Sequence, residues 1–413
     1  MISLELDMIQ SAGLGALALF VGMILTRKIP FLQKFCVPSP VSGGIIFSLI
    51  TLALYAWFDV EVSFVSTLQD VFMMAFFTSV GFQCDLKVIR QGGKLLGFML
   101  ILLVLNITLQ NLMPLGLTRL MGVDPLVGMA AGSVSMTGGH GTVGGFKSVL
   151  EGMGLQGAET IGMAAATFGL VAGSMLGGPL AEKLIRTKLK HEQIQPPPEE
   201  IDPAMSGIEI DEASPVNRTK RVSTNEQEFQ QYAKATYFIL LVMGGGVLLG
   251  RLLARTGITF PTYFGALILA AIIRNTLGLF KKEKSLDMDR IVSVGNICLS
   301  MFLGMALISL KLWQLQSLAL PLIVILLSQV LMIALFAYFV AFPMLGRDYD
   351  AAVLCAGLCG FGLGATPNAM ANMSAVCYKY HYTVKPFLII PIVGAVFTDL
   401  FNTGLITLFL NLI

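Results

Sequence analysis

Residues 312–346 read LWQLQSLALPLIVILLSQVLMIALFAYFVAFPMLG and contain no charged side chain. A helix needs about 20 consecutive apolar residues to cross the hydrocarbon core of a bilayer, and this stretch exceeds that length. Backbone N–H and C=O groups cannot hydrogen-bond to lipid, so an isolated apolar stretch in a membrane is expected to be helical. The stretch therefore predicts a membrane-spanning helix.

The same pattern recurs along the chain, whose composition is 55% hydrophobic and only 13% charged. An ordinary soluble domain carries about 25% charged residues, so a soluble protein with buried core helices is excluded. We predict an all-α polytopic membrane protein with about ten transmembrane helices. The other uncharged runs are residues 11–26, 35–58, 71–84, 95–118, 125–146, 160–181, 235–250, 256–273, 291–310, 351–378 and 386–413.

The charges beside these runs predict the orientation of the chain. Glu5 and Asp7 precede the first run and Arg27 and Lys28 follow it, which is the reverse of the charge order in a cleavable signal peptide. Lys and Arg favour cytoplasmic loops, so the basic residues after the first run are expected inside the cell. We therefore expect the first run to remain as a helix and both termini to lie outside.

Residues 182–234 differ from the rest of the chain because they are dense in charge, poor in aromatic residues and contain Pro196-Pro197-Pro198. Such a composition cannot bury enough apolar surface to fold, which predicts a solvated cytoplasmic linker. The linker divides the chain into an N-terminal half, residues 1–181, and a C-terminal half, residues 235–413.

The two halves share motifs at a nearly constant separation. Because each half is expected to contain five crossing helices, an odd number, the second copy must be inverted relative to the first. Inverted repeats that bind substrate and ion at their interface are a recurrent plan of secondary transporters. The matched pairs are Pro38 and Pro261, Gly43 and Gly265, Asp124 and Asp350, Gly132 and Gly357, and Gly139 and Gly364.

Two apolar segments are unusually rich in glycine: residues 132–145 and residues 357–368, the second ending in Thr366-Pro367-Asn368. Gly and Pro disfavour helix interiors, so we expect both segments to be broken or re-entrant. A helix that starts after the break, at Thr142 or at Thr366, would offer free N–H groups to an anion. The carbonyl groups before each break could coordinate sodium. The alternative is that the glycines only permit close helix packing.

Asp399 is the only acid between Pro386 and Asn411, in the last apolar run. A carboxylate near the bilayer centre is costly and marks a functional pathway by default, although a hydrogen-bonded structural acid is the alternative. Asn402 lies three residues later, on the same helical face. The apolar runs contain no Lys or Arg, so a carboxylate solute would have to be bound by helix N-termini and hydroxyl groups. His140 is either a substrate or proton contact or a polar residue at the loop surface.

The two glycine-rich segments, together with Val37-Pro38-Ser39-Pro40-Val41-Ser42-Gly43-Gly44, resemble those of the bacterial sodium/glutamate symporter family, and the similarity covers nearly the whole chain. The resemblance implies sodium-coupled uptake of L-glutamate across the bacterial inner membrane by two inverted five-helix halves. It also implies that a glycine-rich loop of each half forms the translocation path. Members of this and related families are commonly homodimers that move a transport domain against a scaffold.

These patterns together give a set of candidate site residues. We expect no cofactor and no nucleic-acid partner, with sodium as the coupling ion and the lipid bilayer as the surroundings. The candidate substrate contacts are Thr137, Gly138, Gly139, His140, Gly141, Thr142, Thr366, Asn368, Asp399 and Asn402. The candidate sodium ligands are the hydroxyl groups of Ser133 and Ser135 and the carbonyl groups of Gly360 and Gly362, and the Thr142 hydroxyl group is a further hard oxygen donor for the ion.

Other classes of function fit the sequence less well. An intramembrane aspartyl enzyme needs two facing acids and a zinc enzyme needs a His-Glu cluster, whereas Asp399 is a single deep acid. We therefore do not expect an enzyme. A channel, a proton-coupled carrier and a cation-coupled transporter of a hydroxycarboxylate or dicarboxylate stay open. Dependence of transport on an amine in the solute would distinguish these carboxylates from glutamate.

Overall fold

A computed structural model describes residues 2–35, 37–85, 93–189, 218–256, 260–280 and 286–413, and the description below covers these residues. Within them, seven helical stretches are long and apolar enough to cross a membrane, which confirms the prediction of a polytopic helical membrane protein. These stretches are α1 (Met8–Lys28), α3 (Ser39–Phe58), α6 (Gly93–Met121), α9 (Ala158–Lys188), residues Glu228–Ala254 of α10 (Arg218–Ala254), α12 (Met288–Ile308) and Ala319–Met344.

The last of these stretches consists of α13 (Ala319–Phe336), a π-helical turn η5 (Ala337–Ala341) and α14 (Phe342–Met344). Two short strands, β1 (Ile2–Glu5) and β2 (Val60–Ser63), pair in parallel, and the apolar pattern did not predict them. The remaining helices are α2 (Pro30–Lys34), α4 (Thr67–Gln83), α7 (Pro125–Ala130), α8 (Gly139–Gly152), α11 (Phe264–Leu279), η4 (Leu312–Leu318), α15 (Tyr349–Leu363), α16 (Thr366–Lys379), α17 (Val384–Ile392), η6 (Val393–Phe397) and α18 (Thr398–Leu410).

Several helices begin where the sequence supplies a cap. Asp7 and Gln10 form a reciprocal capping box at the start of α1, with the Asp7 carboxylate accepting from the Gln10 backbone N–H at 2.8 Å. Asp124, Asp287 and Asp348 cap α7, α12 and α15, each with a side chain that accepts from one backbone N–H of the first turn. These caps satisfy N–H groups that the helices themselves leave unpaired.

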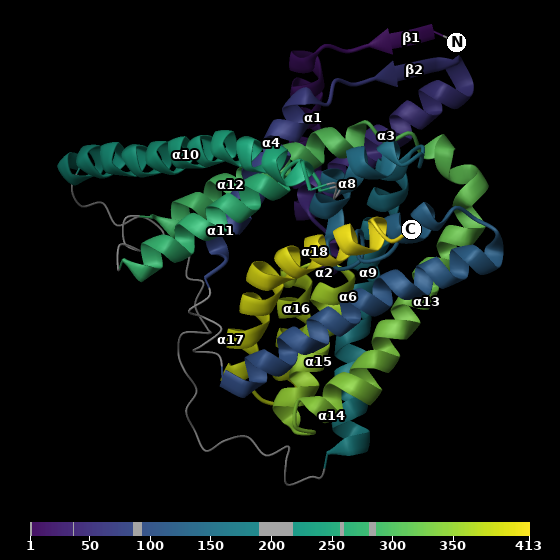
Figure 1. Ribbon diagram of the computed structural model, residues 1–413, viewed down its shortest axis with the longest axis vertical. Coiled ribbons are helices and arrows are strands. Elements are labelled where there is room, and N and C mark those ends of the chain that lie inside the picture. The colour runs from purple at the N-terminus through teal and green to yellow at the C-terminus, as the bar shows by residue number, and fades with distance from the viewer. Residues whose placement is uncertain (1, 36, 86–92, 190–217, 257–259, 281–285) are drawn as a thin grey trace.

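The helices pack into two groups, and we keep these names below. The first group contains α1, α3, α4, α10, α11 and α12, and the second contains α6 to α9 and α13 to α18. In Figure 1, α10, α11 and α12 lie toward one end of the molecule and α14, α15 and α17 toward the other. Contacts between the groups include those of α4 and α12 with α8, and of α4 with η6.

Glycines allow the closest crossings within the first group. A Cβ atom on Gly22 of α1 would lie 1.8 Å from the Ser39 carbonyl oxygen, and one on Gly43 of α3 would lie 1.8 Å from that of Ala18. Any larger residue at these positions would push the two backbones apart. Small residues at helix crossings therefore let α1 and α3 make backbone contact.

The linker expected at residues 182–234 is helical at both of its ends. Helix α9 continues to Lys188 and α10 already begins at Arg218, while residues 190–217 lie outside the described part of the chain. The charges at these two ends are compatible with a helix because long charged side chains can remain in water.

Candidate functional site

A cavity of about 440 Å³ lies between the two helix groups. Its volume falls in the range of about 300–1,000 Å³ that is typical of small-molecule sites. The first group contributes Pro38, residues 76, 77, 80 and 83 of α4, and residues 292, 296, 299 and 303 of α12. The second group contributes residues 137–141, 170, 361, 364–367, 394, 398 and 399.

The first glycine-rich segment is broken, as predicted. Helix α7 ends at Ala130, a series of turns follows, and α8 begins at Gly139, whose positive φ of 64° favours glycine. Thr142 lies inside α8, so the prediction that it begins the helix is wrong. The chain stays compact before Gly139 because backbone N–H groups of the turns, such as that of Gly138, bond to carbonyl groups within the same segment.

Ser133 is the best-anchored residue of this turn segment. Its backbone N–H donates to Asn111 Oδ1 of α6 at 3.1 Å, and its carbonyl oxygen accepts from Asn402 Nδ2 of α18 at 3.0 Å. Thr137 is held as well, since its hydroxyl group donates to Gln110 Oε1 at 2.5 Å. The non-helical backbone of this segment is thus covered by protein side chains, as non-helical backbone inside a membrane would require.

The second glycine-rich segment breaks at one point only. Helix α15 ends at Leu363, and α16 begins at Thr366 with Pro367 in its first turn, as predicted. Of the four glycines in this segment, Gly364 lies at the break, as the C-cap of α15, whereas Gly357, Gly360 and Gly362 remain inside α15. Their role is close packing: a Cβ atom on Gly360 would lie 2.4 Å from Ala369 Cα of α16.

The start of α8 and the start of α16 face the same cavity. Gly139 and Gly364 both line it, and a Cβ atom on Gly139 would lie 3.5 Å from the Gly364 carbonyl oxygen. Each helix is fourteen residues long, and the first N–H groups of a helix together with its dipole attract anions. Two anion-attracting helix ends therefore converge on one cavity from different halves of the chain.

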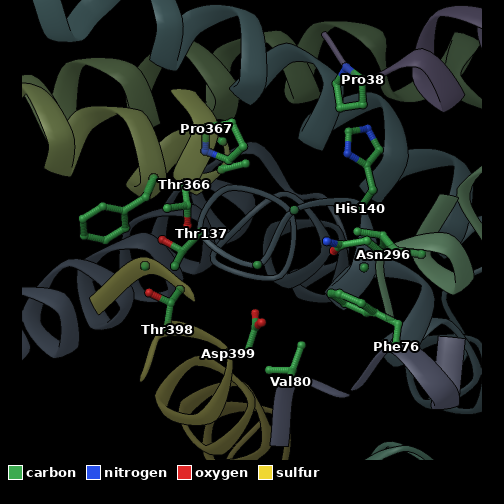
Figure 2. Close-up of a pocket in the computed structure, with 18 of the residues that line it drawn as sticks. Pro38, Phe76, Val80, Thr137, His140, Asn296, Thr366, Pro367, Thr398 and Asp399 are labelled. Atoms are coloured by element: carbon green, nitrogen blue, oxygen red, sulfur yellow. The ribbon is translucent and has the colours of Figure 1, made fainter. Parts of the chain in front are cut away.

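Asp399 contributes a carboxylate to the same cavity. Figure 2 shows its oxygen atoms directed into the cavity, between Thr398 and Val80. The π-helical turn η6 precedes it, and the Thr398 hydroxyl group donates to the Val393 carbonyl oxygen within this turn at 2.9 Å. π-helical turns inside helices are frequent at functional sites, and this one determines where the first residues of α18 point.

His140 also lines the cavity, but its ring is already in contact with a partner. Its Nε2 atom lies 3.0 Å from the Thr167 hydroxyl oxygen of α9, and Figure 2 shows the ring beside Pro38. The Thr167 hydroxyl group also donates to the Met163 carbonyl oxygen. This arrangement holds the His140 side chain against α9, at the edge of the site.

The structure brings seven of the ten predicted substrate contacts to the cavity, namely Thr137, Gly138, Gly139, His140, Gly141, Thr366 and Asp399. The other three are buried nearby but do not line it. Asn368 donates to the Leu170 carbonyl oxygen at 2.8 Å, Asn402 donates to Ser133, and Thr142 is 1% exposed. Their substrate contacts stay predictions, and their geometry indicates contact with neighbouring helices.

The four predicted sodium ligands are in different environments. Ser133 and Ser135 are fully buried, and the Ser135 hydroxyl group donates to the Gly132 carbonyl oxygen at 3.3 Å. The Gly362 carbonyl oxygen accepts from Gln110 Nε2 at 2.5 Å. Gly360 lies inside α15, packed against α16. No metal cluster of three or more His, Cys, Asp or Glu side chains occurs in the described residues.

Sequence reasoning missed the wall that the first helix group contributes. Phe76 and Val80 of α4 and Leu299 of α12 are apolar residues whose sequence gives no sign of a site. Asn296 is different, because an amide inside the apolar run at 291–310 is a polar exception that could have been noticed. Pro38 belonged to a quoted motif but was not proposed as a site residue.

Comparison with known proteins adds a family to this geometry. The family model described as sodium/glutamate symporter matches residues 4–382. A protein of Escherichia coli K12 with the name sodium/glutamate symporter is 38% identical over 410 residues, which cover 99% of this chain and 98% of the relative. Sodium/glutamate symporters of Shigella flexneri and Haemophilus influenzae are 38% and 36% identical, and this chain covers 98% and 95% of their lengths.

Proposed function

We propose that this chain, which belongs to the sodium/glutamate symporter family, carries glutamate across a membrane together with sodium ions. One observation supports the choice of site: the starts of α8 and α16 and the carboxylate of Asp399 face a single cavity. Glutamate has two carboxylates and one ammonium group. Each of its charges would then meet a group of opposite electrostatic character.

In this proposal the two glutamate carboxylates bind at the two helix starts, one near Gly139 on α8 and one near Thr366 on α16. The ammonium group binds to Asp399. Helix N-termini bind carboxylates without a charged side chain, which suits a cavity whose described lining residues include no Lys or Arg. The Thr366 hydroxyl group adds a further hydrogen-bond donor.

Sodium offsets the remaining negative charge. Bound glutamate contributes one net negative charge and Asp399 contributes another, and an uncompensated buried charge is strongly unfavourable. A cation that binds with the solute removes this penalty, and it couples the solute to the sodium gradient. The names of the relatives favour sodium over a proton and glutamate over another carboxylate.

We propose that the two halves are inverted repeats, residues 1–181 and 235–413, joined by a cytoplasmic linker at 182–234. Three correspondences support this. Helix α3 follows Pro38 and α11 follows Pro261, and both pack through glycines on an earlier long helix, α3 on α1 and α11 on α10. The broken pair α7 and α8 corresponds to the broken pair α15 and α16. Finally, α4 packs on α11 as α12 packs on α3.

Transport would follow from movement of the second helix group against the first, since the cavity lies between them. The second group carries both helix starts and Asp399, whereas the first group supplies a largely apolar wall. We place the protein in the bacterial inner membrane as a homodimer with both termini outside. This placement rests on the basic residues expected in the cytoplasm and on the family resemblance.

Uptake of labelled L-glutamate into proteoliposomes tests the proposed function. An inward sodium gradient should drive accumulation, and an equal gradient of choline chloride should not. A proton gradient without sodium should also leave uptake at background. Accumulation that follows the proton gradient and ignores sodium would show that the coupling ion is wrong, and absence of glutamate uptake under every gradient would show that the substrate is wrong.

A further inference from the structure

Three buried side-chain oxygens on residues next to Gly138 have no hydrogen-bond partner in the part of the chain that the structure describes. They are Ser133 Oγ, Thr142 Oγ1 and Asn402 Oδ1. Ser133 and Asn402 are 0% exposed and Thr142 is 1% exposed. Most buried side-chain oxygens in proteins are hydrogen-bonded, so several unpartnered oxygens near one another require an explanation.

These three residues surround Gly138. Asn402 contacts Ser133 directly, because its Nδ2 atom donates to the Ser133 carbonyl oxygen at 3.0 Å. A Cβ atom on Gly138 would lie 2.5 Å from Thr142 Oγ1 and 2.7 Å from Asn402 Nδ2. The ends of the Thr142 and Asn402 side chains therefore reach the same point beside Gly138, one from α8 and the other from α18.

We propose that the oxygens of Ser133, Thr142 and Asn402 bind the sodium ion that is transported with the solute. This inference deepens the proposed function and rests on it for the role of the ion. Hydroxyl and amide oxygens are hard donors, which suit hard cations. The site shares Ser133 and Thr142 with the predicted sodium donors, adds Asn402, and omits Ser135, Gly360 and Gly362.

A buried water molecule is the alternative occupant, because such waters also satisfy unpartnered polar groups. The negative charge of the nearby Asp399 carboxylate favours a cation over a water molecule. Asp399 lies one helical turn before Asn402 on α18, and the described lining of the cavity contains no Lys or Arg to offset its carboxylate. A cation beside Asn402 lowers the cost of both the Asp399 carboxylate and the bound solute.

The position of this sodium site, next to Gly138, also explains how the binding of the ion and the binding of the solute could be coupled. Gly138 lines the cavity on one side and contacts Thr142 and Asn402 on the other. An ion held between α8 and α18 would fix the turn that leads into Gly139, where we place a solute carboxylate. Sodium binding would thus pre-organise the solute site, and this lowers the free-energy cost of ordering it when glutamate binds.

Sodium binding by the purified full-length protein tests the site without glutamate. The melting temperature is measured against NaCl concentration, with choline chloride holding the ionic strength constant. Wild type should be stabilised by sodium up to saturation. Thr142→Val keeps the shape of the side chain and removes its oxygen, so it should raise the half-saturating sodium concentration about tenfold or more. Thr142→Ser retains the oxygen and should behave like wild type.

Thr118→Val is the matched control. Thr118 is equally buried, but its hydroxyl group bonds to Pro114 and Leu115 carbonyl oxygens of its own helix, so the sodium response should not change. If Thr142→Val does not fold, Ser133→Ala replaces it, with the same expected shift. Equal sodium affinity in wild type and Thr142→Val, or a wild type that sodium does not stabilise beyond choline, would overturn the site.

Glutamate uptake by the same proteins separates this inference from the proposed function. Sodium-driven uptake by wild type with unchanged sodium dependence in Thr142→Val would overturn the sodium site and leave the transport function standing. Sodium stabilisation that depends on Thr142, without any glutamate uptake by wild type, would support the sodium site and overturn the transport function.

Discussion

Replacing Asp399 by Asn keeps the size of the side chain and removes its charge, which makes it a direct test of the proposed ammonium contact. The Asp399 carboxylate is half-buried in a cavity whose first-group wall includes Phe76, Val80 and Leu299. Water is therefore restricted around it. Two unit charges about 4 Å apart attract by about 4 kcal/mol at an effective dielectric constant of about 20.

Desolvation of the two charged groups offsets part of this attraction. A hydrogen bond to a charged group contributes a net free energy of about 1.5–3 kcal/mol, and we expect the ammonium contact to fall in this range. Loss of the contact should then weaken glutamate binding about tenfold to a hundredfold. Because Asn fits the same space, the variant should insert into the membrane and fold normally.

The assay compares two solutes in proteoliposomes under a fixed sodium gradient. Glutamate is the first, and glutarate, which has the same two carboxylates and no amine, is the second. Asp399→Asn should raise the half-saturating glutamate concentration about tenfold to a hundredfold. It should change the glutarate concentration that inhibits uptake by half much less. Asp287→Asn, at a helix cap outside the cavity, should leave both values unchanged.

Two results would refute the reasoning. Unchanged glutamate affinity and sodium dependence in Asp399→Asn would make Asp399 a structural acid. An equal loss of affinity for glutamate and glutarate would show that the carboxylate does not recognise the amine. In that case Asp399 would contribute to solute affinity by binding the cation or by shaping the cavity.

Three further predictions follow from the packing and the placement of the chain. Gly22→Ala should destabilise the protein by about 1–3 kcal/mol, seen as a lower melting temperature, because the added carbon meets the α3 backbone; Gly13→Ala on the same helix has open space and should not. In a background without native cysteines, Ala365→Cys should react with a small thiol reagent and be protected by glutamate, whereas the buried Ser135→Cys should stay inert; the reverse pattern would contradict the site. Ser3→Cys should react with an impermeant reagent applied to intact cells, and labelling only after lysis would reverse the proposed orientation.

Much of the helical framework could be predicted from the sequence because it depends on local composition. Uncharged apolar runs become helices in a bilayer whatever their neighbours are, so residues 11–26 and 160–181 correspond to α1 and α9. The start of α16 could also be predicted from the local sequence, because Pro367 lacks an N–H group and suits the first turn of a helix. The short strands were missed because apolar periodicity carries no signal for a pair of four-residue strands.

The candidate site could be predicted only in part. The sequence by itself determined that the chain spans a membrane, that two apolar segments are rich in glycine and that Asp399 is the only acid in the last apolar run. Tertiary packing decided the rest: Gly360 stays inside α15 and lets α16 approach closely, and the side chains of Thr142 and Asn402 both reach Gly138. The physical reason is that local composition determines whether a segment forms a helix, whereas the contacts of a side chain depend on residues far away in the chain.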